Sequence, residues 1–128
     1  MELRLVLTVD DFEQALAFYR DALGLPERDA WQSEGDDARI AILDAGRATL
    51  EIVNDAQAAA IDRIEVGDRV AGPVRVAFEV DDSEAVAARL VEAGARQLAE
   101  PVTTPWNDRN VRLEAPDGTQ LTLFSPTE

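Results

Sequence analysis

The chain of 128 residues contains no cysteine and no histidine, and all twelve of its basic residues are arginine. Without cysteine there is no disulfide, no thiol nucleophile and no thiolate metal ligand. Without histidine the commonest general base and metal ligand is missing, and without lysine no Schiff base can form. The groups that remain for chemistry are carboxylates, hydroxyls, arginine and Tyr19.

Long apolar runs are also absent, since no stretch approaches the roughly 18 residues of a membrane span. The first residues, MELRLVLTVDD, have no basic region and no small-residue cleavage site, so we expect a cytoplasmic protein. The formal net charge of −14 disfavours nucleic acid and anionic membranes as partners. That charge either forms a solvated acidic surface or, if it gathers at a cleft, favours a cationic ligand.

Alternation and turn signals predict the elements in chain order. Residues 2–9 alternate as a half-buried strand. A helix to about Leu23 follows, with Phe12, Leu16, Tyr19 and Leu23 on its apolar face. Asp10 or Asp11 can cap it, and Asp11 with Gln14 has capping-box spacing. Strands follow near 30–32, 39–43 and 48–54, and Asn54 or Asp55 caps a short alanine-rich helix. The second half predicts a strand at 74–80, a helix at 83–93 with Asp81 and Glu84 at capping-box spacing, a loop at 102–110, and strands at 111–115 and 119–124.

The two halves repeat at a constant offset of 71 residues. Val9-Asp10-Asp11 matches Val80-Asp81-Asp82, and some forty residues later Leu50 and Ile52 match Leu121 and Leu123. An offset kept at both ends of a unit favours duplication over coincidence. We therefore predict an α+β fold in which residues 1–128 form one domain, with βαβββ modules at 1–54 and 74–128 joined by a connector at 55–73.

Four segments carry a resemblance to a known family: LRLVLTVDDFEQALAFYRDALGL, ATLEIV, VRVAFEVDD and EAPDGTQLTLFSP. Over nearly the whole chain these resemble the vicinal oxygen chelate superfamily, which includes glyoxalase I, extradiol dioxygenases, and fosfomycin- and bleomycin-resistance proteins. The resemblance implies paired modules whose sheets curve around a cleft, with the helices outside. It also implies a homodimer.

The resemblance implies metal ligands in the first and last strands of each module, typically His or Gln and then Glu. Here those positions hold Arg4 and Arg75, and Glu51 and Thr122. Arginine offers only donors, and one carboxylate with one hydroxyl is too few ligands for a tight divalent site. We expect no metal and no cofactor.

Two hypotheses describe this constellation. In one, Arg4 and Arg75 hold an anionic ligand group and Glu51 positions an arginine or contacts the ligand. In the other, Arg4 and Glu51 form an internal ion pair that only fills the cleft. Other predicted cleft residues are Trp31, Trp106 and Phe124, whose rings offer surfaces for a planar ligand, together with Asn107, Asp108 and Arg109 at the mouth.

Three functions remain open. The first is a metal-free small-molecule-binding protein of the bleomycin-resistance type, which sequesters a ligand such as a drug. The second is an enzyme, either a metal-dependent lyase, isomerase or dioxygenase, or a metal-free variant with Glu51 as the catalytic base, although neighbouring arginine is expected to lower the pKa of Glu51 and weaken it as a base. The third is a structural or regulatory dimer without a ligand.

Overall fold

The computed structural model describes residues 1–22 and 24–127. Its strands are β1 (Glu2–Thr8), β2 (Glu27–Gln32), β3 (Arg39–Ala45), β4 (Ala48–Val53), β5 (Val74–Glu79), β6 (Arg96–Gln97), β7 (Val102–Thr103), β8 (Asp108–Glu114) and β9 (Gln120–Pro126). Its helices are α1 (Phe12–Leu16), the π-helical turn η1 (Ala17–Ala22), α2 (Asp55–Glu65) and α3 (Ser83–Glu92). No helix of this described part is long and apolar enough to cross a membrane.

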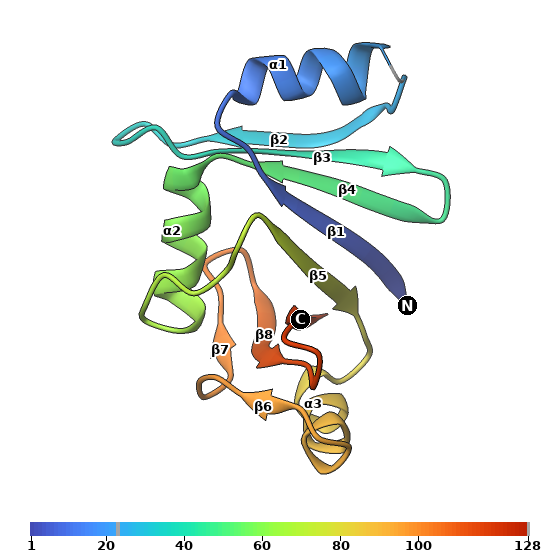
Figure 1. Ribbon diagram of the computed structural model, residues 1–128, viewed down its shortest axis with the longest axis vertical. Coiled ribbons are helices and arrows are strands. Elements are labelled where there is room, and N and C mark those ends of the chain that lie inside the picture. The colour runs from blue at the N-terminus through green and yellow to red at the C-terminus, as the bar shows by residue number, and fades with distance from the viewer. Residues whose placement is uncertain (23, 128) are drawn as a thin grey trace.

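All nine strands belong to one mixed sheet in the order β2-β3-β4-β1-β5-β9-β8-β6, with β7 also paired to β8. The first and last long strands of each half pair in parallel, β1 with β4 and β5 with β9. The antiparallel pair β1–β5 joins the halves edge to edge within one chain. In Figure 1, α1 and α3 lie at opposite ends of the molecule, and α2 runs beside the junction. The predicted α+β fold of two βαβββ modules is confirmed.

The strand register follows the predicted repeat. Leu5 faces Leu50 across β1–β4, and Val76 faces Leu121 across β5–β9, each 71 residues further on. Leu5 and Val76 also face each other at the centre of the β1–β5 pair. Equivalent residues meet there because the modules are related by a pseudo-two-fold axis, as the duplication implies.

Between the equivalent strands β3 and β8 the repeat offset is one residue shorter than between the other strands. On the side of β3, Ile42 faces Glu51, whereas on the side of β8, Arg112 faces Thr122. The turn between β8 and β9 is longer than the turn between β3 and β4, and this turn absorbs the difference. Arg112 therefore occupies in the second module the place that Ile42 occupies in the first.

Side-chain caps begin all three α-helices. Asp11 accepts a hydrogen bond from the backbone N–H of Gln14, as predicted, and Asn54 caps α2 through the N–H of Gln57. The cap of α3 is Asp82 rather than the predicted Asp81, and Asp82 is the residue 71 positions after Asp11. In each case the side-chain oxygen satisfies one of the free N–H groups of the first turn.

Two predicted elements differ in their course. The first predicted helix is present, but it is α-helical only over Phe12–Leu16 and continues as the π-helical turn η1 to Ala22. Leu23 lies outside the described residues. Residues 102–110 are not simply a loop, because β7 lies within them and β8 already begins at Asp108. The short β7 pairs with β8, an interaction that local alternation does not reveal.

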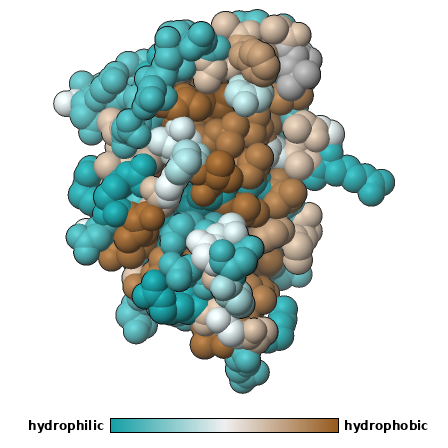
Figure 2. All heavy atoms as spheres, in the orientation of Figure 1, coloured by the Kyte–Doolittle hydropathy of each residue, from teal (hydrophilic) through white to brown (hydrophobic). Residues whose placement is uncertain are grey.

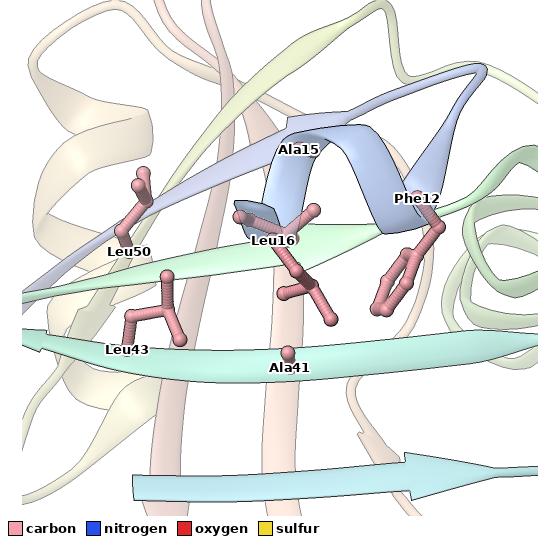
Figure 3. Close-up of a cluster of buried hydrophobic side chains, with 7 residues drawn as sticks. Phe12, Ala15, Leu16, Ala41, Leu43 and Leu50 are labelled. Atoms are coloured by element: carbon pink, nitrogen blue, oxygen red, sulfur yellow. The ribbon is translucent and has the colours of Figure 1, made fainter. Parts of the chain in front are cut away.

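Each module has its own apolar core between its outer helix and the sheet. Figure 3 shows Phe12 and Leu16 of α1 directed at Ala41 and Leu43 of β3. The equivalent cluster under α3 contains Val80, Ala87, Val111, Leu113 and Leu123, with Phe78 packed at its edge. Burying these side chains removes apolar surface from water, which contributes about 1.5–3 kcal/mol for each large one.

The central strands carry apolar residues that neither helix covers. Leu3 and Leu5 are 42% and 37% exposed and Val74 is 48% exposed, so the apolar side of the predicted half-buried strand β1 is not buried at Leu3 and Leu5. Hydrophobic residues also gather across the middle of the face seen in Figure 2. The helices sit over the outer strands of each module, which leaves the β1–β5 junction without cover.

Candidate functional site

A single large cavity of about 620 Å³ lies where the two modules and α2 meet. Its apolar wall comes from β2, β3, α2, β5, β9 and the segment before β8: Ala30, Trp31, Ile40, Ile42, Ala60, Ile61, Ile64, Ala77, Pro105, Trp106 and Phe124. Its polar lining residues are Arg4, Asp29, Glu51, Gln57, Glu65, Arg75, Asp108, Asn110 and Thr122. A mostly apolar wall with a few polar groups is typical of a small-molecule site.

The residues at the four predicted central positions come together in this cavity. Arg4 Nη1 lies 3.5 Å from Glu51 Oε1, and Arg75 Nη2 lies 3.7 Å from Glu51 Oε2. Arg75 Nη1 donates a hydrogen bond to Thr122 Oγ1 at 2.6 Å. Strand alternation turns all four to the same face, and the register of the parallel pairs sets them side by side. Glu51 thus lies between two guanidinium groups.

Arg4 is also held from outside the cavity. Its Nε donates to Thr49 Oγ1 and its Nη2 to Glu2 Oε2, both at 3.1 Å, and its guanidinium stands 5.1 Å from the centre of the Phe124 ring. Glu2 in turn pairs with Arg28 at 2.9 Å. These contacts fix the guanidinium of Arg4 over Phe124.

Burial raises the pKa of Glu51, although Arg75 and Arg4 act in the opposite direction. The prediction of a lowered pKa for this carboxyl group is therefore wrong. Only 6% of the residue is exposed, and neither arginine comes close enough to donate a hydrogen bond to it. Desolvation therefore outweighs the two loose ion pairs.

The sequence comparisons agree with this architecture. The model of the Glyoxalase/Bleomycin resistance protein/Dioxygenase superfamily matches residues 3–123. The chain belongs to this superfamily. CFP32 of Mycobacterium bovis and of Mycobacterium tuberculosis, whose name assigns it provisionally as a glyoxylase, is 30% identical over 94% of this chain. This chain spans only 42% of the length of that relative.

Solved structures share the superfamily fold at low identity. A hypothetical protein of Bacillus halodurans has a TM-score of 0.71 at 18% identity, with 98% of this chain and 93% of that chain covered. A methylmalonyl-CoA epimerase variant of Streptomyces coelicolor, in complex with 2-nitronate-propionyl-CoA, gives 0.67 at 21% identity, with 98% and 96% covered. The methylmalonyl-CoA epimerase of Mycobacterium tuberculosis gives 0.69 at 20% identity, with 98% and 87% covered. At these identities the likeness concerns the fold alone.

The donor set at the four predicted central positions does not fit a divalent cation. Arg4 and Arg75 present only N–H donors, and the Thr122 hydroxyl already accepts from Arg75. Glu51 is the single carboxylate left, whereas divalent metals take several oxygen or nitrogen ligands. Among the described residues no group of three His, Cys, Asp or Glu side chains is placed to hold a metal ion.

The connector helix α2 contributes more to the site than its sequence suggested. One face of it, with Gln57, Ile61, Ile64 and Glu65, closes the cavity. Residues 55–73 were predicted only as a connector, so this wall of the cavity was not predicted. The spacing of 57, 61 and 64 is the helical signal that could have pointed to an inward face.

Charged residues of α2 enter a buried network in the second module. Asp62 Oδ1 lies 2.8 Å from Arg112 Nη1, and Glu65 Oε1 accepts from Arg112 Nε at 3.2 Å. Glu65 also accepts from Asn110 at 3.0 Å and from the Thr122 hydroxyl at 3.4 Å. This network connects α2 through Thr122 to Arg75, so the same contacts anchor the helix and shape the base of the cavity.

The predicted aromatic and mouth residues divide in two. Trp31, Trp106, Phe124 and Asp108 line the cavity, and both tryptophans remain about half exposed at 55% and 47%. Burial raises the pKa of Asp108, against lowering by nearby Arg4. Arg109 does not line the cavity, because it turns to Glu84 at 3.1 Å and to Thr103. Asn107, whose φ of 68° is left-handed, is likewise absent from the lining.

Proposed function

We propose that this chain is a metal-independent small-molecule-binding protein of its superfamily, with the ligand held in the central cavity. The observation that carries the proposal is the cavity itself: about 620 Å³, walled by apolar side chains, with the superfamily's central positions occupied by Arg4, Arg75, Glu51 and Thr122. A space of this size suits a drug-sized molecule. Sequestration of such a molecule, as in a resistance protein, requires no chemistry at Glu51.

Placement of the tryptophans supports the proposal and supplies the assay. Trp31 and Trp106 are the only tryptophans and both line the cavity. A ligand that covers either indole should shift its emission and raise the melting temperature, because a ligand that binds only the folded state stabilises it. We would screen aromatic natural products, including cationic ones, by thermal shift and by tryptophan emission.

A variant with a filled cavity tests whether the signals come from binding in the cavity. Filling the cavity with Ala77→Trp should abolish both signals, whereas Ala93→Trp, at the exposed end of α3, should leave them intact. Elemental analysis of untreated protein completes the test. A stoichiometric divalent metal in the purified protein, or a library without a single stabilising hit, would count against the proposal.

The raised pKa of Glu51 favours one alternative, a metal-free acid–base enzyme in which Glu51 moves a proton of the ligand. The solved relatives include methylmalonyl-CoA epimerases, so methylmalonyl-CoA is a reasonable first probe. Exchange of its 2-hydrogen for deuterium in heavy water, lost in Glu51→Gln, would support this alternative. Binding without exchange would support sequestration.

We also propose that two copies associate through the uncovered apolar strip of β1 and β5. The strip consists of Leu3, Leu5, Val74 and Val76, and it is flanked by Leu7 and Phe78, which pack against the two cores. An apolar strip that meets the same strip of a second copy about a two-fold axis forms an isologous interface, the commonest kind in homo-oligomers.

A further inference from the structure

Glu51 is a buried carboxylate that accepts no hydrogen bond from any described residue. It is 6% exposed, and its closest cationic atoms stand 3.5 and 3.7 Å away, beyond good hydrogen-bond length. The Glu51 oxygens are not fully enclosed by protein atoms. Because Glu51 lines the cavity, these oxygens open onto it. A buried acceptor without a donor is costly, and a ligand can supply that donor.

Part of the donor set of the two arginines is used within the protein, and Arg4 Nη1 and Arg75 Nη2 face Glu51. Arg4 gives its Nε to Thr49 and its Nη2 to Glu2, and Arg75 gives its Nη1 to Thr122. An anionic ligand group would have to compete with these partners and with Glu51 itself. This arrangement disfavours the hypothesis that Arg4 and Arg75 hold an anion.

The charges around the base point the same way. The connected network pairs five guanidinium groups with five carboxylates: Arg4, Arg28, Arg69, Arg75 and Arg112 with Glu2, Asp44, Glu51, Asp62 and Glu65. These charges balance, so a further anion would leave an unpaired negative charge in the network. A cation seated on Glu51 would lie beside two guanidinium groups, which also disfavours it.

We propose that the cavity selects a ligand with an apolar body and an uncharged hydrogen-bond donor, such as a hydroxyl or amide N–H, that is seated on Glu51. This inference rests on the proposed binding function and specifies the chemical class of its ligand. The apolar body packs against the wall formed by Ile40, Ile42, Ile61 and Ile64. Glu51 accepts the donor without any change in the charge of the site.

A matched series of small probes tests the donor. The probes are 4-phenylbutan-1-ol, its methyl ether and 4-phenylbutanoate, which share one body and differ in donor and charge. Dissociation constants come from tryptophan emission and calorimetry. We expect the alcohol to bind about tenfold more tightly than the ether, the effect of one hydrogen bond to a charged group, and the carboxylate to bind most weakly.

The variant Glu51→Gln sharpens the test, because it removes the charge that neutralises Arg4 and Arg75. We expect it to weaken binding of the alcohol and to strengthen binding of the carboxylate, which reverses the order of the two. Glu114→Gln on the same strand as Asn110 removes a carboxylate outside the cavity and should leave the order unchanged.

The outcomes separate the two proposals. Equal affinity for alcohol and ether, or tighter binding of the carboxylate by the unaltered protein, overturns the donor inference while binding itself stands. Absence of binding by all three probes up to their solubility limits counts against the binding function and therefore against this inference too. If Glu51→Gln does not fold, the probe series on the unaltered protein still decides.

Discussion

Arg112 of β8 and Asp62 of α2 form an ion pair of 2.8 Å, with side chains 0% and 1% exposed. Asp62 also accepts from the backbone N–H groups of Val70 and Ala71, and these bonds, with Arg112, lower its pKa against the effect of burial. The pair therefore fixes both the connector helix and the chain that follows it. It ties the connector to the second module, beside the cavity.

Arg112→Leu is expected to destabilise the fold strongly, because it removes the buried guanidinium that Asp62 and Glu65 share. Asp62 keeps its pair with Arg69, whereas Glu65 keeps no ion pair among the described residues. Loss of one member of a buried pair typically costs about 3–5 kcal/mol. Urea unfolding followed by circular dichroism measures the effect. The matched control is Arg109→Leu on the same strand, whose pair with Glu84 is partly exposed and should cost below about 1 kcal/mol. Similar losses for the two variants would show that the buried network is not what anchors α2.

Asn54 is the second anchor of α2. Its Oδ1 accepts from the N–H of Gln57 at 3.0 Å and from the N–H of Arg39 at 3.1 Å, and its amide donates to the carbonyl of Asp37. Asn54→Ala removes a helix cap and leaves a partly buried N–H unpaired, so we expect a loss of about 2–3 kcal/mol in the free energy of unfolding.

Asn54→Asp keeps the accepting oxygen and loses only the amide donor, so its loss should be smaller. Asp11→Ala is the comparison at an exposed cap and should cost about 1 kcal/mol. An Asn54→Ala loss no larger than that of Asp11→Ala would contradict a role for Asn54 beyond capping.

The repeat was readable from the sequence because strand and helix periodicity are local, and the offset of 71 residues led to Arg4, Glu51, Arg75 and Thr122, which lie together at the base of the cavity. Arg109 was misplaced because residues 102–110 were predicted as a loop, whereas Arg109 lies in β8 between β7 and β9 and its side chain reaches Glu84 of α3.

The part that could not be predicted depends on contacts between distant segments. Asp62 and Glu65 look like solvated residues of a polar helix until β8 places Arg112 against them. The pKa of Glu51 was predicted in the wrong direction because the sequence shows the neighbouring charges but not the depth of burial, which is the larger effect.

The proposed dimer predicts a variant that dissociates it. Leu5 lies at the centre of the apolar strip and is 37% exposed, so Leu5→Glu would place two like charges at the centre of a two-fold interface. We expect a dimer by light scattering for the unaltered protein and a monomer for Leu5→Glu. Val91→Glu, on the exposed side of α3, is the control and should remain dimeric. A monomeric unaltered protein, or a Leu5→Glu variant that stays dimeric, would show that the strip is not a dimer interface.

The raised pKa of Glu51 makes stability depend on pH in an unusual direction for a carboxyl group. In the unfolded chain the group ionises near 4.5, whereas in the folded protein it holds its proton to higher pH. Its contribution is therefore most favourable below about 4.5 and is lost as pH rises through the folded-state pKa.

Glu51→Gln does not titrate, so the unaltered protein should lose stability relative to this variant between pH 4.5 and neutrality. Urea unfolding of both proteins across that range measures the difference, and Glu114→Gln serves as the exposed control. A difference that stays constant, or that moves in favour of the unaltered protein as pH rises, would show that Arg4 and Arg75 outweigh burial at Glu51.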